Sequence, residues 1–399
     1  MRTGDTLGIV PAMTSSLFHP PHSRWLCRTA IFASLLFLAA GAFAADEKNT
    51  ELVCIRNRPL VSVSLNKIDP YYMLLDFSIP QTILSCEVAE YLGLETIPGL
   101  SPEIRKTRLD SFRCGNRPSV SSACVVMDLA PLCGLLGATV AGIVNPRVFG
   151  PEIVLDIGHG GFVARGAADA ALHDEKDPRT VKMSVTGDLP TVPALLNGAM
   201  QRSCVLDTTF GGTVAVSEAL LAELGIALDA APKLVVRTLP GAVNDPVGRV
   251  QVRLKSVRVG AVEIRNPLCA VEPGNQPPCL GIGFLRHFRA ILNFDQGLVR
   301  LETDAASPPC DAPVIGCGLV LAAFRDDFWT VWIALNSPAD RAGIPPDSVL
   351  LAVNGKDMKG ASHAEAFASL PSEEGQEAEI TVSHGEEVRT VSLKAETLL

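Results

Sequence analysis

The feature that most constrains this chain is an internal repeat. Asn66 precedes Asp76 by ten residues, and Asn197 precedes Asp207 at the same spacing. Each Asp closes an apolar run, Leu-Leu-Asp in the first copy and Val-Leu-Asp in the second. A second block follows each copy with equal internal spacings: Gly142, Arg147, Phe149 and Asp156 match Gly281, Arg286, Phe288 and Asp295. Two blocks repeated in the same order predict two similar units of about 125 residues each.

Both units have the pattern of β-strands. Residues 61–65 and 250–254 alternate apolar and polar side chains, the period of a strand with one buried face. Residues 217–225 indicate a short helix that begins at Ser217 and ends at a glycine. We therefore expect one lobe over residues 50–165 and a second over 181–303, with a polar linker between them. Asp156 and Asp295 are expected to cap turns.

The repeated aspartates suggest a chemistry. Two carboxylates brought together across a twofold axis would share one proton, because like charges a few ångströms apart resist joint ionisation. One carboxylate then acts as a base on water, while the protonated partner polarises a peptide carbonyl. Asp76 and Asp207 are therefore the candidate catalytic pair.

The motifs around these residues resemble the aspartic protease superfamily, particularly its retropepsin-like branch and the two-lobed pepsin-like members. The resemblance covers about residues 55–303 and is carried by Leu196-Asn197-Gly198, by Val205-Leu206-Asp207-Thr208-Thr209, by residues 281–286 and by residues 292–295. It implies a mostly β fold of two homologous acid-protease-like lobes related by a pseudo-twofold axis. It also implies a polypeptide substrate in the cleft between them.

The loops that would support the pair depart from the family's Asp-Thr-Gly. The second lobe keeps Thr208 but has Thr209 at the glycine position, and the first lobe has Phe77 and Ser78. In the family the two threonines brace the loops against each other, a bond that phenylalanine cannot make. The alternative is a catalytically degenerate scaffold that binds peptide or protein, or a purely structural adaptor. Restoring Asp-Thr-Gly is expected to help an enzyme only if Phe77 does not fill a pocket of the fold.

A Pro- and Ala-rich linker over residues 303–313 precedes a C-terminal segment, 314–399, that resembles a PDZ domain. Ser337-Pro338 predicts a capped helix, residues 349–353 a strand, Asn354-Gly355 a tight turn and residues 364–370 a second helix. The resemblance implies binding of a peptide C-terminus or an extended segment at a sheet edge. Its binding loop would be Gly316, Cys317, Gly318 and Leu319. The alternative is a module that only packs.

The first 44 residues predict export. Arg24 and Arg28 precede the apolar run 30–40, and Ala42-Phe43-Ala44 offers small residues for cleavage. Met13 is an alternative start. The run is shorter than a membrane anchor needs. We expect a periplasmic or extracellular protein without a stable membrane span after cleavage.

Composition excludes several classes of function. The formal net charge of −9 is spread along the chain and no basic stripe occurs, so nucleic acid is not expected as a partner. No Gly-x-Ser-x-Gly or His-Glu-x-x-His motif is present, and Gly158-His-Gly-Gly161 lacks the residues of a phosphate loop. Neither a metal nor a cofactor is expected. Ten cysteines follow the predicted signal, and they are interpreted either as disulfides of unknown pairing or as buried apolar residues.

Overall fold

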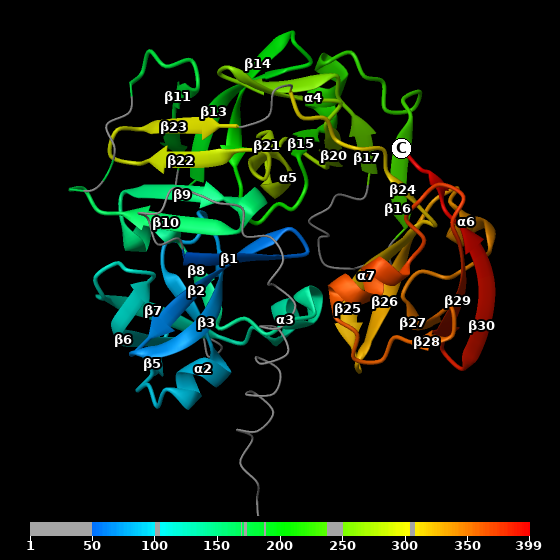
Figure 1. Cartoon of the computed structure of the whole chain (residues 1–399), viewed down its shortest axis with the longest axis horizontal. Helices are drawn as coiled ribbons and strands as arrows, with labels where there is room; N and C mark the ends of the chain where they lie inside the picture. The colour runs from blue at the N-terminus through cyan, green and yellow to red at the C-terminus, as the bar shows by residue number, and fades with distance from the viewer. Residues whose placement is uncertain are drawn as a thin grey trace, which may run out of the picture. The chain divides into compact units, whose positions relative to one another are not determined.

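The computed structural model describes residues 50–99, 104–168, 170, 174–186, 189–237, 250–303 and 308–399. The signal predicted over residues 1–44 lies outside them. Residues 47–399 form a compact unit, described here by itself. The fold is mostly β, with two acid-protease-like lobes followed by a PDZ-like domain (Figure 1). Within these ranges no helix is both long and apolar enough to cross a membrane.

The first lobe contains ten strands and four short helices. In chain order they are β1 (Thr50–Ile55), β2 (Arg58–Leu65), β3 (Ile68–Leu75), β4 (Thr82–Ser85), α2 (Cys86–Tyr91), β5 (Ile97–Pro98), β6 (Arg105–Cys114), β7 (Val120–Met127), α3 (Ala130–Leu136), β8 (Gly142–Val144), η1 (Pro146–Phe149), β9 (Glu152–Asp156), η2 (Ile157–His159) and β10 (Gly161–Arg165).

The second lobe follows a closely similar order. Its elements are β11 (Thr180–Lys182), β12 (Ser184–Thr186), β13 (Leu189–Leu196), β14 (Met200–Leu206), β15 (Val214–Ser217), α4 (Glu218–Glu223), β16 (Lys233–Arg237), β17 (Val250–Arg253), β18 (Ser256–Val259), β19 (Val262–Arg265), β20 (Leu268–Glu272), β21 (Cys279–Leu280), α5 (Ile282–Leu285), β22 (Arg289–Asn293) and β23 (Leu298–Glu302).

Helices α2 and α4 show how alike the two lobes are. The Ser85 hydroxyl caps α2 by accepting from the Val88 amide at 3.2 Å, and Ser217 caps α4 through Leu220 at the same distance. The helix predicted over residues 217–225 is therefore confirmed. A serine cap satisfies amides that the first helical turn leaves without partners, which explains why the same residue recurs.

In each lobe a short strand threads between the two strands that flank the aspartate loop. Strand β8 pairs in parallel with β3 and antiparallel with β4. Strand β21 pairs in parallel with β14 and antiparallel with β15. This shared threading places the chain after β3 and after β14, where Asp76 and Asp207 lie, in equivalent surroundings.

The predicted match of Gly142 with Gly281 in the second sequence block is wrong by three residues. The Asp76 amide donates to the carbonyl of Val144, whereas the Asp207 amide donates to that of Leu280, each at 3.0 Å. The equivalent of Gly281 is therefore Asn145, not Gly142. Gly142 is required for a different reason, because a Cβ there would overlap the carbonyl oxygen of Ile83.

The predicted pairing of Asp156 with Asp295 is also wrong. Asp156 does cap the turn that follows β9, accepting from the amide of His159 at 3.3 Å. In the second lobe the cap is Asn293, which accepts from the amide of Gln296 at 2.9 Å, while Asp295 is exposed. The equivalent positions are thus the last residues of β9 and β22, Asp156 and Asn293, and not the two repeated aspartates.

The lobes are joined by the antiparallel pair β9–β22 (Figure 1). Val154 lies opposite Ile291 at the centre of this pair, and the flanking partners are arranged symmetrically about it. The strand order β11-β23-β22-β9-β10-β1 continues this pairing to both sides. One apolar core runs through both lobes, and it includes Leu75, Phe77 and Leu206.

The C-terminal domain is a twisted sheet with two helices. Its elements are β24 (Ile315–Gly316), β25 (Leu319–Arg325), β26 (Phe328–Ala334), α6 (Pro338–Arg341), β27 (Ser348–Val353), β28 (Lys356–Asp357), α7 (His363–Ser369), β29 (Glu377–His384), β30 (Glu387–Lys394) and β31 (Glu396–Thr397). Ser337 caps α6, and Asn354 and Gly355 form a turn with positive φ. Strand β16 of the second lobe pairs with β26, so one sheet continues from that lobe into this domain.

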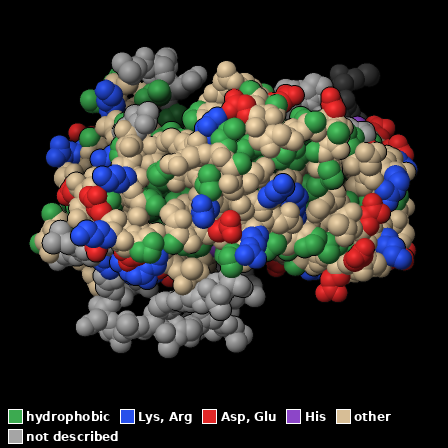
Figure 2. All heavy atoms as spheres, turned by 90° about the horizontal axis from the view of Figure 1, so that it is seen from above, with side chains coloured by type: hydrophobic (Ala, Val, Ile, Leu, Met, Phe, Trp, Pro, Cys, Tyr) green, Lys and Arg blue, Asp and Glu red, His purple; other side chains and the backbone are tan. Residues whose placement is uncertain are grey.

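Figure 2 shows acidic and basic side chains interspersed over one face of the molecule, with apolar side chains between them. On that face no continuous stripe of Lys and Arg is visible. The expectation that nucleic acid is not a partner remains a prediction.

The threading predicts a strict need for glycine at Gly281. A Cβ at this position would overlap the carbonyl oxygens of Phe210 and Gly212, which are backbone atoms of the Asp207 loop. We expect Gly281→Ala to lower the free energy of unfolding by about 2–3 kcal/mol in urea titrations. Gly316→Ala is the control, since its Cβ would meet nothing nearer than 3.8 Å. Equal stability of Gly281→Ala and wild type would contradict the threading.

Candidate active site

Asp76 and Asp207 each follow directly on a buried strand. Leu75 ends β3 and Leu206 ends β14, and both are fully buried. Hydrogen bonds from the backbone amides of Asp76 and Asp207 to the carbonyls of Val144 and Leu280 fix the backbone nitrogen of each aspartate. Asp76 is 8% exposed, whereas Asp207 is only half-buried.

Hydroxyl side chains orient both carboxylates. The amide and hydroxyl of Ser78 donate to Asp76 Oδ1 at 2.7 and 2.5 Å. The amide and hydroxyl of Thr209 donate to Asp207 Oδ1, both at 2.7 Å. From the sequence, Ser78 and Thr209 are only losses of glycine, but in the structure they make matching contacts.

Burial and neighbouring groups change the pKa of the Asp76 carboxyl. Burial raises the pKa of the Asp76 carboxyl, and the two hydrogen bonds from Ser78 oppose that shift. The negative charge of Asp207 raises the pKa of Asp76 further. The charge of Asp207 therefore acts on Asp76 from the other lobe, and the catalytic role of the pair remains a prediction.

Apolar packing stands where the resemblance to aspartic proteases implies a brace of two threonines. Thr208 is fully buried, and its hydroxyl has no hydrogen-bond partner among the residues that the structure describes. Phe77 is 1% exposed in the shared core, and its ring centroid lies 5.8 Å from that of Phe294. The first-lobe loop is therefore anchored by an aromatic side chain instead of a reciprocal hydroxyl.

Two asparagines brace the loops, and sequence reasoning missed both. The Asn145 amide donates to the carbonyls of Phe77 and Ile79 at 3.1 and 2.9 Å, which holds the Asp76 loop. The Asn57 amide donates to Gly211 O at 3.1 Å and so reaches the Asp207 loop from the first lobe. The signal for Asn145 is its place at the threading position before a proline. No sequence signal links Asn57 to Gly211, which lies 154 residues away.

The predicted peptide loop of the C-terminal domain is a tight, packed turn. Cys317 is buried, and its carbonyl accepts from the Ala339 amide at 2.9 Å. Gly318 has φ +86°, and a Cβ there would overlap the side chain of Ser337. Gly316 belongs to β24 and Leu319 begins β25. Peptide binding by Gly316, Cys317, Gly318 and Leu319 remains a prediction.

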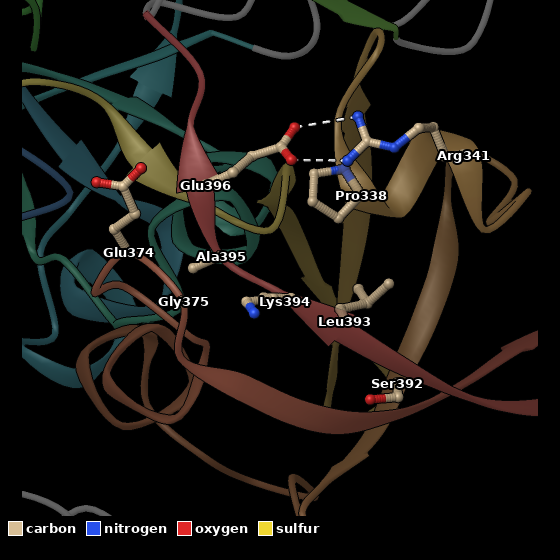
Figure 3. A pocket seen from close by; sticks show the side chains of 9 residues that line it. All are labelled: Pro338, Arg341, Glu374, Gly375, Ser392, Leu393, Lys394, Ala395 and Glu396. Atoms are coloured by element: carbon tan, nitrogen blue, oxygen red, sulfur yellow. Dashed lines mark hydrogen bonds and ion pairs between the residues drawn. The ribbon is translucent and has the colours of Figure 1, made fainter.

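A pocket of about 450 Å³ lies elsewhere in this domain (Figure 3). It is lined by Pro338, Arg341, Glu374, Gly375, Ser392, Leu393, Lys394, Ala395 and Glu396. Arg341 donates to both carboxylate oxygens of Glu396, at 3.0 and 2.7 Å, and so ties α6 to β31. The pocket does not include the predicted peptide loop.

The cysteines and acids build no further centre in the part of the chain that the structure describes. All ten cysteines after the predicted signal are unpaired thiols. Burial raises the pKa of the Cys114 and Cys204 thiols to about 12, as expected for small apolar core residues. No group of three or more His, Cys, Asp or Glu side chains in the described ranges could hold a metal ion.

No family model matches the chain. It is 29% identical over 105 residues to the "Probable CtpA-like serine protease" of several Staphylococcus aureus strains, a match of 26% of this chain. The chain spans about a fifth (21%) of the length of these curated relatives.

Solved structures with similar parts include proteases and a plant globulin. A retropepsin-like aspartic protease from Rickettsia conorii covers 31% of this chain and 89% of its own, with 17% identity and a TM-score of 0.24. Basic 7S globulin from soybean covers 64% and 95%, with 9% identity and a TM-score of 0.37. The photosystem II D1 C-terminal processing protease covers 22% and 24%, with 23% identity and a TM-score of 0.20.

The burial of Phe77 decides what restoring Asp-Thr-Gly would do. Phe77→Thr removes a ring from the shared core, and we expect the free energy of unfolding to fall by about 3 kcal/mol or more. Phe367→Thr, at a position 58% exposed, is the control and should change it by less than about 0.5 kcal/mol. Urea denaturation followed by fluorescence measures both. A Phe77→Thr protein as stable as wild type would show that the ring is not a core element.

Proposed function

We propose that this protein is an exported aspartic-type endopeptidase in which Asp76 and Asp207 activate water for peptide-bond hydrolysis. The observation that carries the proposal is that Asp76 and Asp207 follow equivalent strands, β3 and β14, in two lobes joined by the β9–β22 pair. Burial, and to a smaller degree the charge of Asp207, raises the pKa of Asp76. The matched hydroxyl contacts of Ser78 and Thr209 support it, because they hold both carboxylates in fixed orientations.

The difference in environment assigns the two roles. Asp76 is the more buried carboxyl with a raised pKa, so it holds the shared proton and donates it to the peptide carbonyl oxygen. Asp207 is more exposed and acts as the base. It takes a proton from water as the water oxygen bonds to the carbonyl carbon. That proton then passes to the leaving nitrogen as the C–N bond breaks, and a hydroxyl of the intermediate returns a proton to Asp76.

A degenerate scaffold that binds peptide without cutting it is the second candidate. The observation that favours it is the buried Thr208 hydroxyl, which has no partner among the described residues because Phe77 stands where the family has a second threonine. A loop anchored by apolar packing lacks a directional bond across the axis. In this candidate the inter-lobe cleft holds an extended polypeptide, and the predicted loop at residues 316–319 holds a second peptide segment.

Export and peptide binding by the C-terminal domain are part of the proposal. Export rests on the sequence of residues 1–44, and peptide binding rests on the resemblance to PDZ domains. The partial similarity to CtpA-like proteases supports the second point, although it covers about a fifth of those proteins.

If Asp76 and Asp207 act as one unit, removing either carboxylate should remove nearly all turnover. We expect Asp76→Asn and Asp207→Asn each to abolish cleavage of a mixed peptide library between pH 3 and 7, with the double variant little worse. Wild-type activity should be bell-shaped on the acid side, because one carboxyl must be protonated and the other ionised. Asp295→Asn, an exposed acid of the repeat, is the control and should retain activity. Cleavage that survives either substitution would refute the pair, and a folded wild type that binds peptides without cleaving them would favour the second candidate.

A further inference from the structure

The turn between β1 and β2 places the side chains of Arg56 and Asn57 against two different parts of the protein. Arg56 and Asn57 both have positive φ, 51° and 53°, the conformation of a two-residue hairpin turn that matches the twist of its strands. The turn is anchored by the β1–β2 pairing, with Ile55 opposite Arg58. The backbone thus holds both side chains at the tip of a hydrogen-bonded hairpin.

One side of this turn contacts the Asp207 loop. Besides the hydrogen bond from Asn57 to Gly211 O, the backbone of Gly211 lies directly against the turn. A Cβ at Gly211 would overlap the guanidinium of Arg58 and would lie 3.4 Å from the carbonyl oxygen of Arg56. Any larger residue at position 211 would displace the end of the Arg58 side chain and press on Asn57 Cβ, 3.1 Å away.

On the other side of the turn, the Arg56 side chain binds the C-terminal domain. The Arg56 guanidinium donates to the carbonyls of Leu321 and Ala322 in β25, at 2.5 and 2.6 Å. It also donates to the carbonyl of Leu135 at the end of α3. A planar guanidinium suits such a cluster of acceptors because its N–H groups diverge in one plane.

The Arg56 guanidinium also packs over the ring of a buried tryptophan, Trp329. Trp329 is fully buried in the C-terminal core, and the Arg56 guanidinium carbon lies 5.6 Å from its ring centroid. A Cβ at Gly137, just after α3, would overlap the same ring. On the far side His363 packs edge-on against Trp329, with ring centroids 5.2 Å apart. Burial lowers the pKa of His363 to about 4, and the positive charge of Arg56 adds to that shift.

We propose that Asn57 is a positioning residue for the Asp207 loop and that the C-terminal domain sets its place through Arg56. The domain is then part of the catalytic machinery by contact rather than only a recruiter of substrate. Arg56 and Asn57 are adjacent in one stiff turn, so a displacement of β25 moves the donor that holds Gly211. The proposal rests on the function proposed for Asp76 and Asp207, which it deepens.

The test uses the full mature chain and substitutions that preserve the turn. Asn57→Gly keeps the positive φ but removes the amide, and Asn57→Asp keeps the shape but replaces the donor by an acceptor. Arg56→Ala removes the hydrogen bonds to β25, and Arg56→Lys keeps the positive charge without the planar guanidinium. The matched controls are Asn66→Gly, another turn asparagine with φ 47°, and Arg325→Ala, an exposed arginine at the end of β25.

Hydrogen exchange tests the positioning independently of activity. The amides of Ile282 and Gly283 donate to Phe210 and Gly212 at 2.8 and 2.9 Å, so they report how firmly the Asp207 loop is held. We expect Asn57→Gly, Asn57→Asp and Arg56→Ala to speed exchange at these amides by about fivefold, as for the loss of one hydrogen bond, with Arg56→Lys intermediate. The controls should leave it unchanged.

Kinetics of peptide cleavage provides the second readout. For the Asn57 variants and Arg56→Ala we expect kcat to fall about tenfold with KM within about twofold of wild type, the result of a misplaced carboxylate. Unchanged exchange in Arg56→Ala would overturn the link to the C-terminal domain, and unchanged exchange in both Asn57 variants would overturn the positioning role. A wild type that cleaves no peptide would refute the proposed function alone, because the exchange measurements still decide whether the turn holds the loop.

Discussion

The antiparallel pairing of β9 with β22 is the contact on which the candidate site depends. Its centre, Val154 opposite Ile291, lies where the two lobes meet, and each lobe is arranged about it in the same way. Backbone hydrogen bonds fix both the distance and the direction of the lobes. The loops that follow β3 and β14 are therefore placed symmetrically about this contact. Burial, and to a smaller degree the charge of Asp207, raises the pKa of Asp76.

Within this symmetric frame the supports of the two loops are unequal. The Asp76 loop is held inside its own lobe by Asn145 and by the buried ring of Phe77. The Asp207 loop is held from outside its lobe by Asn57, and Thr208 contributes packing without a described hydrogen bond. Asp76 is buried and Asp207 only half-buried. In the proposed function this difference separates a proton holder from a base.

The sequence predicted those parts of the fold that local chemistry determines. Asn66 and Asn197 repeat because both adopt positive φ and accept a backbone N–H from a neighbouring segment, Asp110 for Asn66 and Lys255 for Asn197. The serine caps and the tight turn at Asn354-Gly355 are local in the same sense. For this reason, the strand pattern, the short helices and the repeated aspartates could be predicted from the sequence.

Contacts between residues far apart in the chain could not be predicted from the sequence. The match of Gly142 with Gly281 was wrong by three residues because a glycine demanded by the Ile83 carbonyl was matched to one demanded by the Asp207 loop. The contact of Asn57 with Gly211 and that of Arg56 with β25 join residues more than 150 positions apart, and no spacing rule reveals them. The role of the C-terminal domain in holding a loop therefore emerges only from the folded chain.

Titration of the Asp76 carboxyl measures its electrostatic coupling to Asp207. The carboxyl carbon of Asp76 can be followed by NMR across pH in wild type and in Asp207→Asn, with Asp295→Asn as the control. Removing the charge of Asp207 should lower the pKa of Asp76, since that charge is one of the causes that raise it. A pKa of Asp76 that is the same in wild type and in Asp207→Asn would contradict the account.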